Sequence, residues 1–153
     1  MLQTITDHLE KILKDYSGRI AAIPEETYLY KPQPEKWSKK EILGHLVDSA
    51  QNNIRRFVVA QYENVPTIVY NQDKWVAIAG YQHYPTQDLA ALWTLLNRHI
   101  VRVLANTSEE AAQRKSDTCG PETYTIEWLA ADYCHHLLHH LHQLLDLDPI
   151  AYR

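Results

Sequence analysis

The stretch from Cys134 to Leu144 constrains the fold most, because it gathers five of the nine histidines in one segment. It contains no Gly or Pro, and its leucines recur at spacings of three and four residues, which predicts an amphipathic helix. At about 100° per residue, one side of this helix is apolar and is expected to be buried. The expected buried face consists of Ile126, Ala130, Tyr133, Leu137, Leu141 and Leu144.

The histidines of this helix divide into two groups. His135, His139 and His142 fall roughly opposite the apolar face and are expected to be solvated. His136 and His140 lie four residues apart at the edge of the apolar stripe, where side chains are about 6 Å from each other. This pair can contribute two ligands to one metal ion. The alternative is a pair of hydrogen-bonded histidines at the border of the core.

Three more amphipathic segments precede this helix, which is expected to run from about residue 123 to 145. They span about residues 4–23, 38–63 and 86–106. Ser38 and Glu41 form the pattern of a capping box at the start of the second segment. Four long amphipathic helices predict an all-α fold, a four-helix bundle.

The connection between the second and third helices, residues 66–85, is long and rich in aromatic residues. A connection of this length is uncommon in a compact domain and is often functional. It is expected to contain a short helix over residues 73–79. Tyr70, Trp75 and Tyr81 either cover the mouth of a site or pack as a hydrophobic lid over one end of the bundle.

The composition indicates a single globular domain and argues against two classes of partner. At 153 residues, with 45% hydrophobic and 22% charged residues, the chain is expected to be one domain over residues 1–153. The formal charge of −4 leaves no basic surface, so no nucleic-acid partner is expected. No apolar run reaches the length of about 20 residues that a membrane helix needs, so no membrane partner is expected.

The N-terminal residues, the cysteines and the exposed helix faces bear on localisation and assembly. The first residues show no signal-peptide pattern. Cys119 and Cys134 form no CxxC motif and no disulfide framework. A cytoplasmic location is therefore expected. Exposed apolar helix faces in bundles of this type can also pair, so a homodimer is considered.

The second helix supplies one more histidine near its apolar face. His45 lies at the edge of that face, and the same edge continues with Ser49, Asn52, Asn53 and Arg56. Burying such groups without partners costs on the order of 1–3 kcal/mol each, so this polar line indicates a polar pocket inside the bundle. Asp48 is expected to face solvent or to lie behind the metal ligands.

Together, His45, His136 and His140 would give three nitrogen ligands on facing helices. Three neutral ligands leave positions for water or substrate, which is typical of a catalytic site. The order of metal affinities allows zinc, nickel or copper there. His99, on the third helix, is expected to be an imidazole at the edge of the core or, alternatively, an additional ligand.

Several of these segments resemble one known family, the DinB-like (YfiT-like) metalloenzymes. Residues 37–49, with Asn52-Asn53 and Arg56-Phe57, are similar to its second-helix signature. Residues 70–76 are similar to its aromatic segment. Residues 136–144 match its C-terminal HxxHHxxQ pattern, with His142 where the family more often has Gly.

The resemblance implies an up-down-down-up four-helix bundle whose three histidines, here His45, His136 and His140, hold a divalent metal, usually zinc or nickel. Members include transferases that join a low-molecular-weight thiol such as bacillithiol to electrophiles. Others are thiol-dependent isomerases or are known only as metal-dependent hydrolases. A small-molecule substrate and a thiol co-substrate are therefore expected.

The leading hypothesis is an enzyme in which the metal activates a thiol or a water. Asn53 and Arg56, and less directly Asn52, would line the pocket, and Arg56 could bind a carboxylate. One alternative is a metal-binding domain without turnover, closed by a fourth ligand such as His99. Another is a helical interaction protein whose histidines bind no metal.

Overall fold

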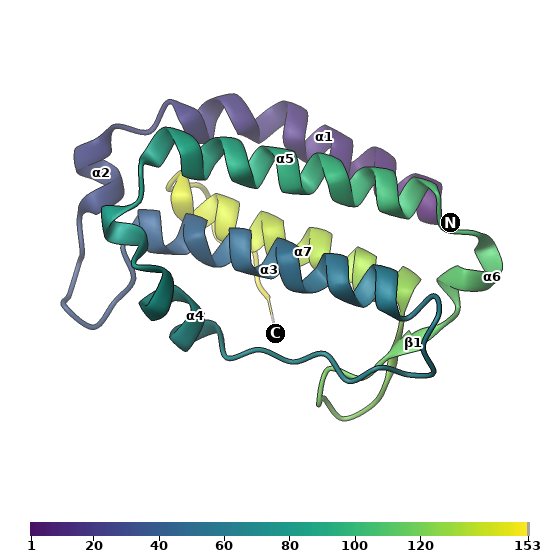
Figure 1. The fold of residues 1–153 in the computed structure, drawn as a ribbon. Helices are drawn as coiled ribbons and strands as arrows, with labels where there is room; N and C mark the ends of the chain where they lie inside the picture. The colour runs from purple at the N-terminus through teal and green to yellow at the C-terminus, as the bar shows by residue number, and fades with distance from the viewer. Residues whose placement is uncertain (153) are drawn as a thin grey trace.

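The computed structural model describes residues 1–152 and is dominated by four long helices (Figure 1). They are α1 (Leu2–Ala21), α3 (Lys39–Val59), α5 (Thr86–Ala105) and α7 (Ile126–Leu144). Each of the four helices predicted from the apolar spacing is present. Their apolar faces meet in one core, in which the largest fully buried side chains include Trp93, Tyr28 and Phe57.

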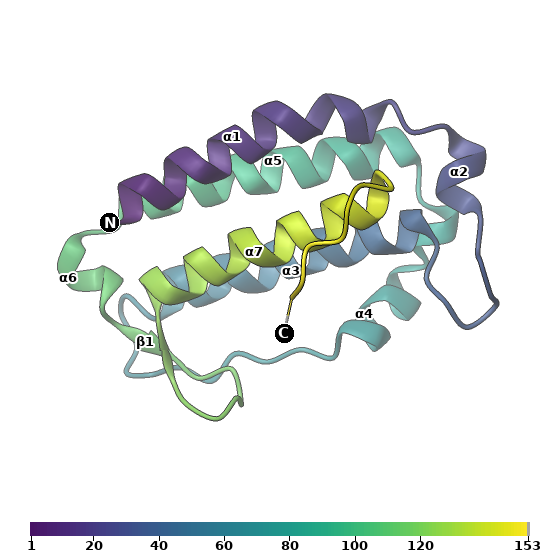
Figure 2. The ribbon, with the colours of Figure 1, turned by 180° about the vertical axis from the view of Figure 1, so that it is seen from behind.

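The bundle has the up-down-down-up arrangement (Figures 1 and 2). Helix α1 packs against α5 and α7, and α3 packs against the same two helices. Helices α3 and α5 run in the same direction, so the chain must cross the length of the bundle between them. This explains the long connection over residues 60–85. The neighbouring pair α3 and α7 is antiparallel.

Local sequence signals set the start of α3. The Ser38 side chain accepts a hydrogen bond from the Glu41 backbone N–H, and the Glu41 carboxylate accepts one from the Ser38 backbone N–H, which completes the predicted capping box. The helix ends at Val59 rather than near Glu63, because the chain turns at residues 60–63. The short predicted helix in the connection is α4 (Gln72–Ala79), which Gly80 terminates in the left-handed conformation.

The structure contains small elements that the apolar spacing did not predict. They are α2 (Glu25–Leu29), the 3₁₀ helix η1 (Tyr81–His83), α6 (Glu109–Ala112), β1 (Lys115–Ser116) and β2 (Tyr124–Thr125). The two strands pair antiparallel, Lys115 with Thr125 and Ser116 with Tyr124. Each element is too short for a periodic pattern. Among residues 1–152, no helix combines the length and the apolar character that crossing a bilayer requires.

The connection between α3 and α5 is held on α3 by Tyr81. The Tyr81 hydroxyl donates a hydrogen bond of 2.5 Å to Asp48 Oδ1. Its ring lies over Gly44, where an added Cβ would come within 2.1 Å of Tyr81 Cδ2. The expectation that Asp48 faces solvent is therefore wrong, since its side chain is buried against η1. Burial raises the pKa of Asp48 to about 6, although the Tyr81 hydrogen bond opposes the shift.

Candidate metal centre

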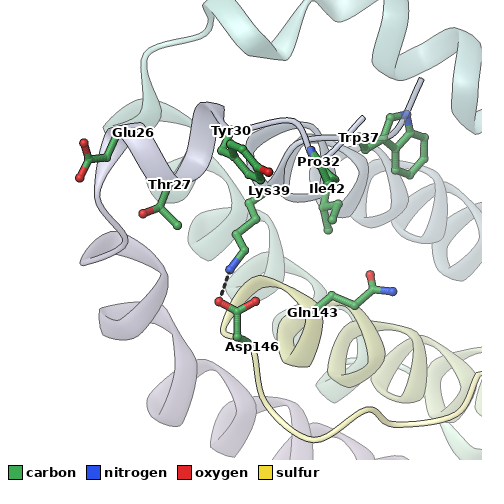
Figure 3. A pocket seen from close by; sticks show the side chains of 9 residues that line it. All are labelled: Glu26, Thr27, Tyr30, Pro32, Trp37, Lys39, Ile42, Gln143 and Asp146. Atoms are coloured by element: carbon green, nitrogen blue, oxygen red, sulfur yellow. Dashed lines mark hydrogen bonds and ion pairs between the residues drawn. The ribbon is translucent and has the colours of Figure 1, made fainter. Parts of the chain in front are cut away.

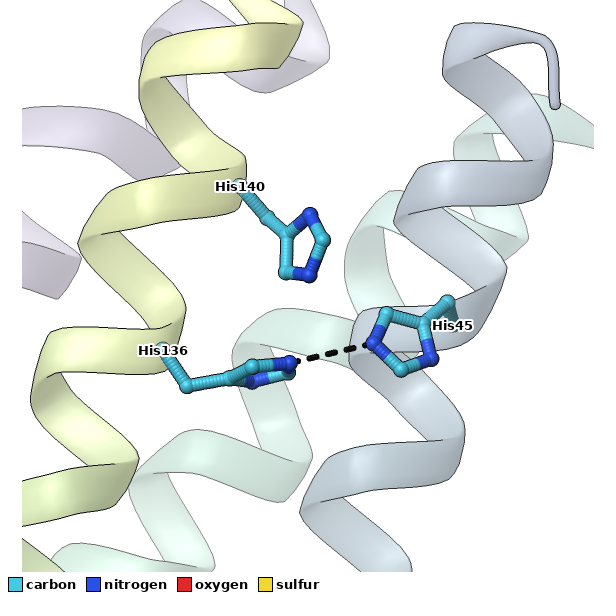
Figure 4. Close-up of side chains that lie close together, drawn as sticks. All are labelled: His45, His136 and His140. Atoms are coloured by element: carbon cyan, nitrogen blue, oxygen red, sulfur yellow. Dashed lines mark hydrogen bonds between the residues drawn. The ribbon is translucent and has the colours of Figure 1, made fainter. Parts of the chain in front are cut away.

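Three imidazoles meet at the seam between α3 and α7 (Figure 4). His45 comes from α3, and His136 and His140 come from successive turns of α7. His45 Nε2 lies 3.1 Å from His136 Nε2, and one nitrogen of each ring lies within 4.8 Å of the others. The structure thus brings together the three histidines selected from the sequence.

This geometry fits a single metal ion. Two imidazole nitrogens bound to one tetrahedral zinc at 2.0–2.1 Å are about 3.3 Å apart, close to the separation of the His45 and His136 nitrogens. Among residues 1–152, the group of close potential ligands has three members and includes no carboxylate or thiol. A site of this kind leaves coordination positions for a small molecule.

The electrostatics keep these rings neutral, the form that binds metal. Burial lowers the pKa of His45 to about 3, with a further contribution from His140. Burial, followed by the neighbouring His140 and His45, lowers the pKa of His136 to about 2. The pKa of His140 is also lowered by burial, although its hydrogen bond to Gln143 opposes the shift.

Hydrogen bonds orient two of the rings. Gln143 Oε1 accepts from His140 Nδ1 at 2.8 Å, which leaves the Nε2 lone pair of His140 free for a ligand. Ser49 Oγ lies 3.4 Å from His136 Nδ1 and helps to orient that ring, although a hydroxyl, which can donate or accept, does not set its tautomer. The sequence pattern contained Gln143 in the HxxHHxxQ motif but did not reveal its role. Its position three residues after His140 is the signal that could have identified it.

His45 is held differently. The Trp37 ring packs on it at a centroid distance of 5.1 Å. Its Nδ1 atom is buried and has no hydrogen-bond partner within residues 1–152. The packing of Trp37 and the contact of His45 Nε2 with His136 Nε2 therefore hold this ring, with no hydrogen bond at Nδ1 among residues 1–152.

The predicted pocket residues Asn53 and Arg56 form a chain of contacts that ends at the imidazoles. Arg56 Nη1 lies 3.4 Å from Asn53 Oδ1, and Asn53 Nδ2 donates to Ser49, to its carbonyl oxygen at 2.9 Å and to its Oγ at 3.4 Å. Ser49 Oγ in turn contacts His136 Nδ1. The guanidinium also donates twice to the Ile68 carbonyl oxygen, at 3.2 and 3.0 Å. Arg56 forms no ion pair with a carboxylate of residues 1–152. Its charge contributes to the lowered pKa of His136.

Two other predicted residues do not reach the site. Asn52 is buried, but its amide donates to the Asp48 carbonyl oxygen of its own helix at 2.9 Å. His99 is exposed, so the expectation of a core-edge or ligating imidazole is wrong. The helical phase of α5 instead buries Asn97, whose side chain accepts a hydrogen bond from Tyr133.

His139 and His142 are half-buried rather than fully solvated, because the C-terminal segment folds back along α7 (Figure 2). His139 Nδ1 donates to the Ile150 carbonyl oxygen at 2.6 Å, and His142 Nδ1 donates to that of Asp148 at 2.7 Å. His142 Nε2 also lies 3.1 Å from the Tyr16 hydroxyl. Only His135 of the three is exposed, as expected. A tail that folds back over a helix leaves no periodic signal in the sequence.

Aromatic residues lie next to the imidazoles. Tyr70 lies beside Ser49 and Arg56, both of which oppose the rise in its pKa that burial causes. The exposed Trp75 contacts Tyr70 edge-on at 5.6 Å. Tyr81 lies instead against Asp48 and does not cover the mouth. Tyr152, which the sequence did not suggest, packs on His136 at 5.2 Å.

Comparisons with known proteins agree with this architecture. The model of the DinB superfamily matches residues 8–144. No curated protein matches the chain at a significant level. YfiT from Bacillus subtilis, described as a probable metal-dependent hydrolase with an unusual four-helix bundle topology, superposes with a TM-score of 0.83 at 19% identity. That alignment covers 95% of this chain and 84% of YfiT.

A second solved structure, a mycothiol-dependent maleylpyruvate isomerase, has a TM-score of 0.74 at 14% identity. The alignment covers 99% of this chain but 62% of the isomerase, so this chain corresponds to only part of that protein. At these identities the two likenesses establish the shared fold.

Proposed function

This chain belongs to the DinB superfamily, and from that premise we propose that it is a metal-dependent enzyme whose ion, zinc or nickel, is held by His45, His136 and His140. The observation that carries the proposal is the convergence of three neutral imidazoles, one buried and two half-buried, without a fourth close ligand in residues 1–152. A closed structural site would hold its ion with four protein ligands.

A divalent ion at this position would lower the pKa of a thiol or a water and so supply a nucleophile near neutral pH. The chain's own residues would prepare the site for it. Gln143 holds the His140 ring in one tautomer and orientation, and Ser49 contacts the His136 ring, so that the ligand nitrogens converge before substrate arrives.

A thiol is the preferred nucleophile in this proposal, and the transfer of its sulfur to an electrophilic carbon is the preferred reaction. Arg56 supports this choice. Its guanidinium is fixed by Ile68 and Asn53, lies near His136 and has no carboxylate partner in residues 1–152. A fixed, unpaired guanidinium binds carboxylates well, so it would hold the carboxylate of a small thiol. Hydrolysis by an activated water is the second candidate, supported by the same open site.

The test uses untagged protein loaded with zinc or nickel and two thiols that differ in charge, thioglycolate and 2-mercaptoethanol. The electrophile is 1-chloro-2,4-dinitrobenzene, which forms a sulfur–carbon bond as chloride leaves and the thiol proton is released. We expect metal-dependent conjugation that metal-free protein and the His136→Ala/His140→Ala variant lack. Arg56→Gln should raise KM for thioglycolate and leave KM for 2-mercaptoethanol nearly unchanged.

A parallel assay follows hydrolysis of 4-nitrophenyl acetate without thiol. Metal-dependent hydrolysis with no thiol conjugation would replace the transferase by the hydrolase. Rates equal to the uncatalysed background in both assays would contradict the enzyme proposal and favour a metal-binding domain without turnover.

A further inference from the structure

A cavity of about 680 Å³ lies one helical turn away from the imidazoles, between α2, the start of α3 and the end of α7 (Figure 3). Its volume is in the range of pockets that bind small molecules. Ile42 on α3 precedes His45 by three residues, and Gln143 on α7 follows His140 by three. Both line the cavity, so it lies directly beyond the two ligand-bearing turns.

Two lining residues touch the histidines themselves. Trp37 packs on the His45 ring, and Gln143 accepts the hydrogen bond from His140. Figure 3 shows these two side chains at one end of the cavity and Glu26 at the other. A molecule in the cavity would therefore be separated from the candidate metal ligands by two side chains that already contact them.

The walls are mainly apolar and aromatic. Trp37 and Tyr30 present rings, Pro32 presents its pyrrolidine ring, and Ile42 presents a branched alkyl group. Flat apolar surfaces of this kind favour an aromatic ligand, because ring contacts add about 0.5–1.5 kcal/mol each beyond the area that they bury.

The charges of the cavity disfavour an anion. Among residues 1–152 its one lining cation is Lys39, which is already paired with Asp146 at a Nζ–Oδ2 distance of 2.6 Å. Glu26 adds a second carboxylate at the rim. The charged groups of the lining therefore sum to a small negative charge, in contrast to Arg56 farther along α3, a cation with no ion-pair partner among residues 1–152.

We propose that this cavity binds the uncharged aromatic part of the electrophilic substrate, beside the metal centre. Its assignment to a substrate rests on the proposed function, whereas the binding itself does not. The site would then receive its two reactants from different directions, the anionic thiol from the side of Arg56 and the apolar electrophile from the side of Trp37.

The experiment titrates zinc-loaded, ¹⁵N-labelled protein with 4-nitrobenzyl alcohol and follows the indole N–H signals of its four tryptophans. Trp37→Phe identifies the Trp37 signal. We expect this signal to shift on titration while those of Trp93 and Trp128 stay in place. The anionic analogue 4-nitrobenzoate should bind more weakly than the alcohol.

Tyr30 and Tyr62 provide a matched pair of variants, because their exposed fractions are 68% and 67% and only Tyr30 lines the cavity. Tyr30→Ala should weaken binding of the alcohol by about 2- to 10-fold. Tyr62→Ala should leave it unchanged. Both side chains lie at the surface, so neither variant should unfold the protein.

Three outcomes would overturn the inference: an unmoved Trp37 signal, tighter binding of 4-nitrobenzoate than of the alcohol, or equal effects of the two tyrosine variants. Repeating the titration with metal-free protein separates the two proposals. Binding that persists there, in a protein that shows no conjugation when loaded with metal, would support the cavity and contradict the transferase.

Discussion

Gln143 lies one helical turn beyond His140 on α7, and its Oε1 accepts a 2.8 Å hydrogen bond from His140 Nδ1. The same amide reaches the His139 ring, where Gln143 Nε2 lies 3.3 Å from His139 Nε2. One side chain thereby fixes the ring that would bind metal and a neighbouring ring that holds the C-terminal segment.

This relationship makes Gln143 a measurable part of the metal site. We expect Gln143→Leu to weaken zinc binding by about 10- to 100-fold, because the His140 ring loses the partner that sets its tautomer. Competition with a fluorescent zinc chelator measures the change. His139→Ala removes the second contact of Gln143 and should have a much smaller effect. Equal effects would mean that Gln143 acts through the C-terminal segment instead.

Removal of the ligands themselves should abolish metal binding. Untagged protein should bind one zinc, and the His136→Ala/His140→Ala variant none, as measured by elemental analysis after dialysis. His135→Ala is the control, because His135 is on the same helix but exposed. Unchanged zinc content in the double variant would show that the ion binds elsewhere.

His45→Leu should also lose zinc but remain folded, because leucine suits the buried edge that His45 occupies. It also removes the Nδ1 atom that is buried without a partner in residues 1–152, and relieving such a group offsets the lost ring packing. Thermal unfolding of metal-free protein checks this. A loss of folding in this variant would assign His45 a structural role.

The stability of the metal-free protein should fall as the pH drops below about 6.5. His45 and His136 stay neutral in the fold, with pKa values of about 3 and about 2, whereas in the unfolded chain they take up protons near pH 6.5. Below pH 6.5, each of these two histidines therefore lowers the free energy of unfolding by about 1.4 kcal/mol per pH unit. Asp48 has the opposite effect and raises the free energy of unfolding as the pH falls, since its folded pKa of about 6 exceeds the ordinary pKa of 3.8. One carboxyl does not outweigh two imidazoles.

Urea unfolding in the presence of a chelator at pH 7, 6 and 5 tests this. The slope of stability against pH should be smaller in His45→Leu by about 1.4 kcal/mol per unit and unchanged in His135→Ala. An unchanged slope in His45→Leu would mean that this imidazole titrates normally in the fold.

Gly44 should tolerate no side chain. An added Cβ would meet the Tyr81 ring at 2.1 Å, so Gly44→Ala should destabilise the protein by about 1–3 kcal/mol. Tyr81→Ala removes the obstacle, so the double variant should be more stable than the sum of the two single effects predicts. Additive effects in urea unfolding would place the strain elsewhere.

Much of the fold could be predicted from the sequence because its signals are local. The apolar spacing identified the four long helices, and Ser38 with Glu41 identified the start of α3. The same periodicity placed His136 and His140 on one edge of α7 and His45 on the edge of α3. The predicted buried face of α7 is buried in full.

The parts that the sequence left open, or that were predicted wrongly, depend on contacts between distant segments. Asp48 is buried because Tyr81 binds it across 33 residues, and His139 is covered because Ile150 folds back onto it. His99 is exposed because the rotation of α5 follows its packing on α1 and α3.

The sequence by itself therefore determined which side chains share a helix face, since that depends on the 3.6-residue repeat alone. Only the tertiary structure decided that the faces carrying His45 and His140 meet, with Gln143 and Trp37 positioned around them. The way helices pack, and the path of the chain between them, depends on the whole core at once and not on any local pattern.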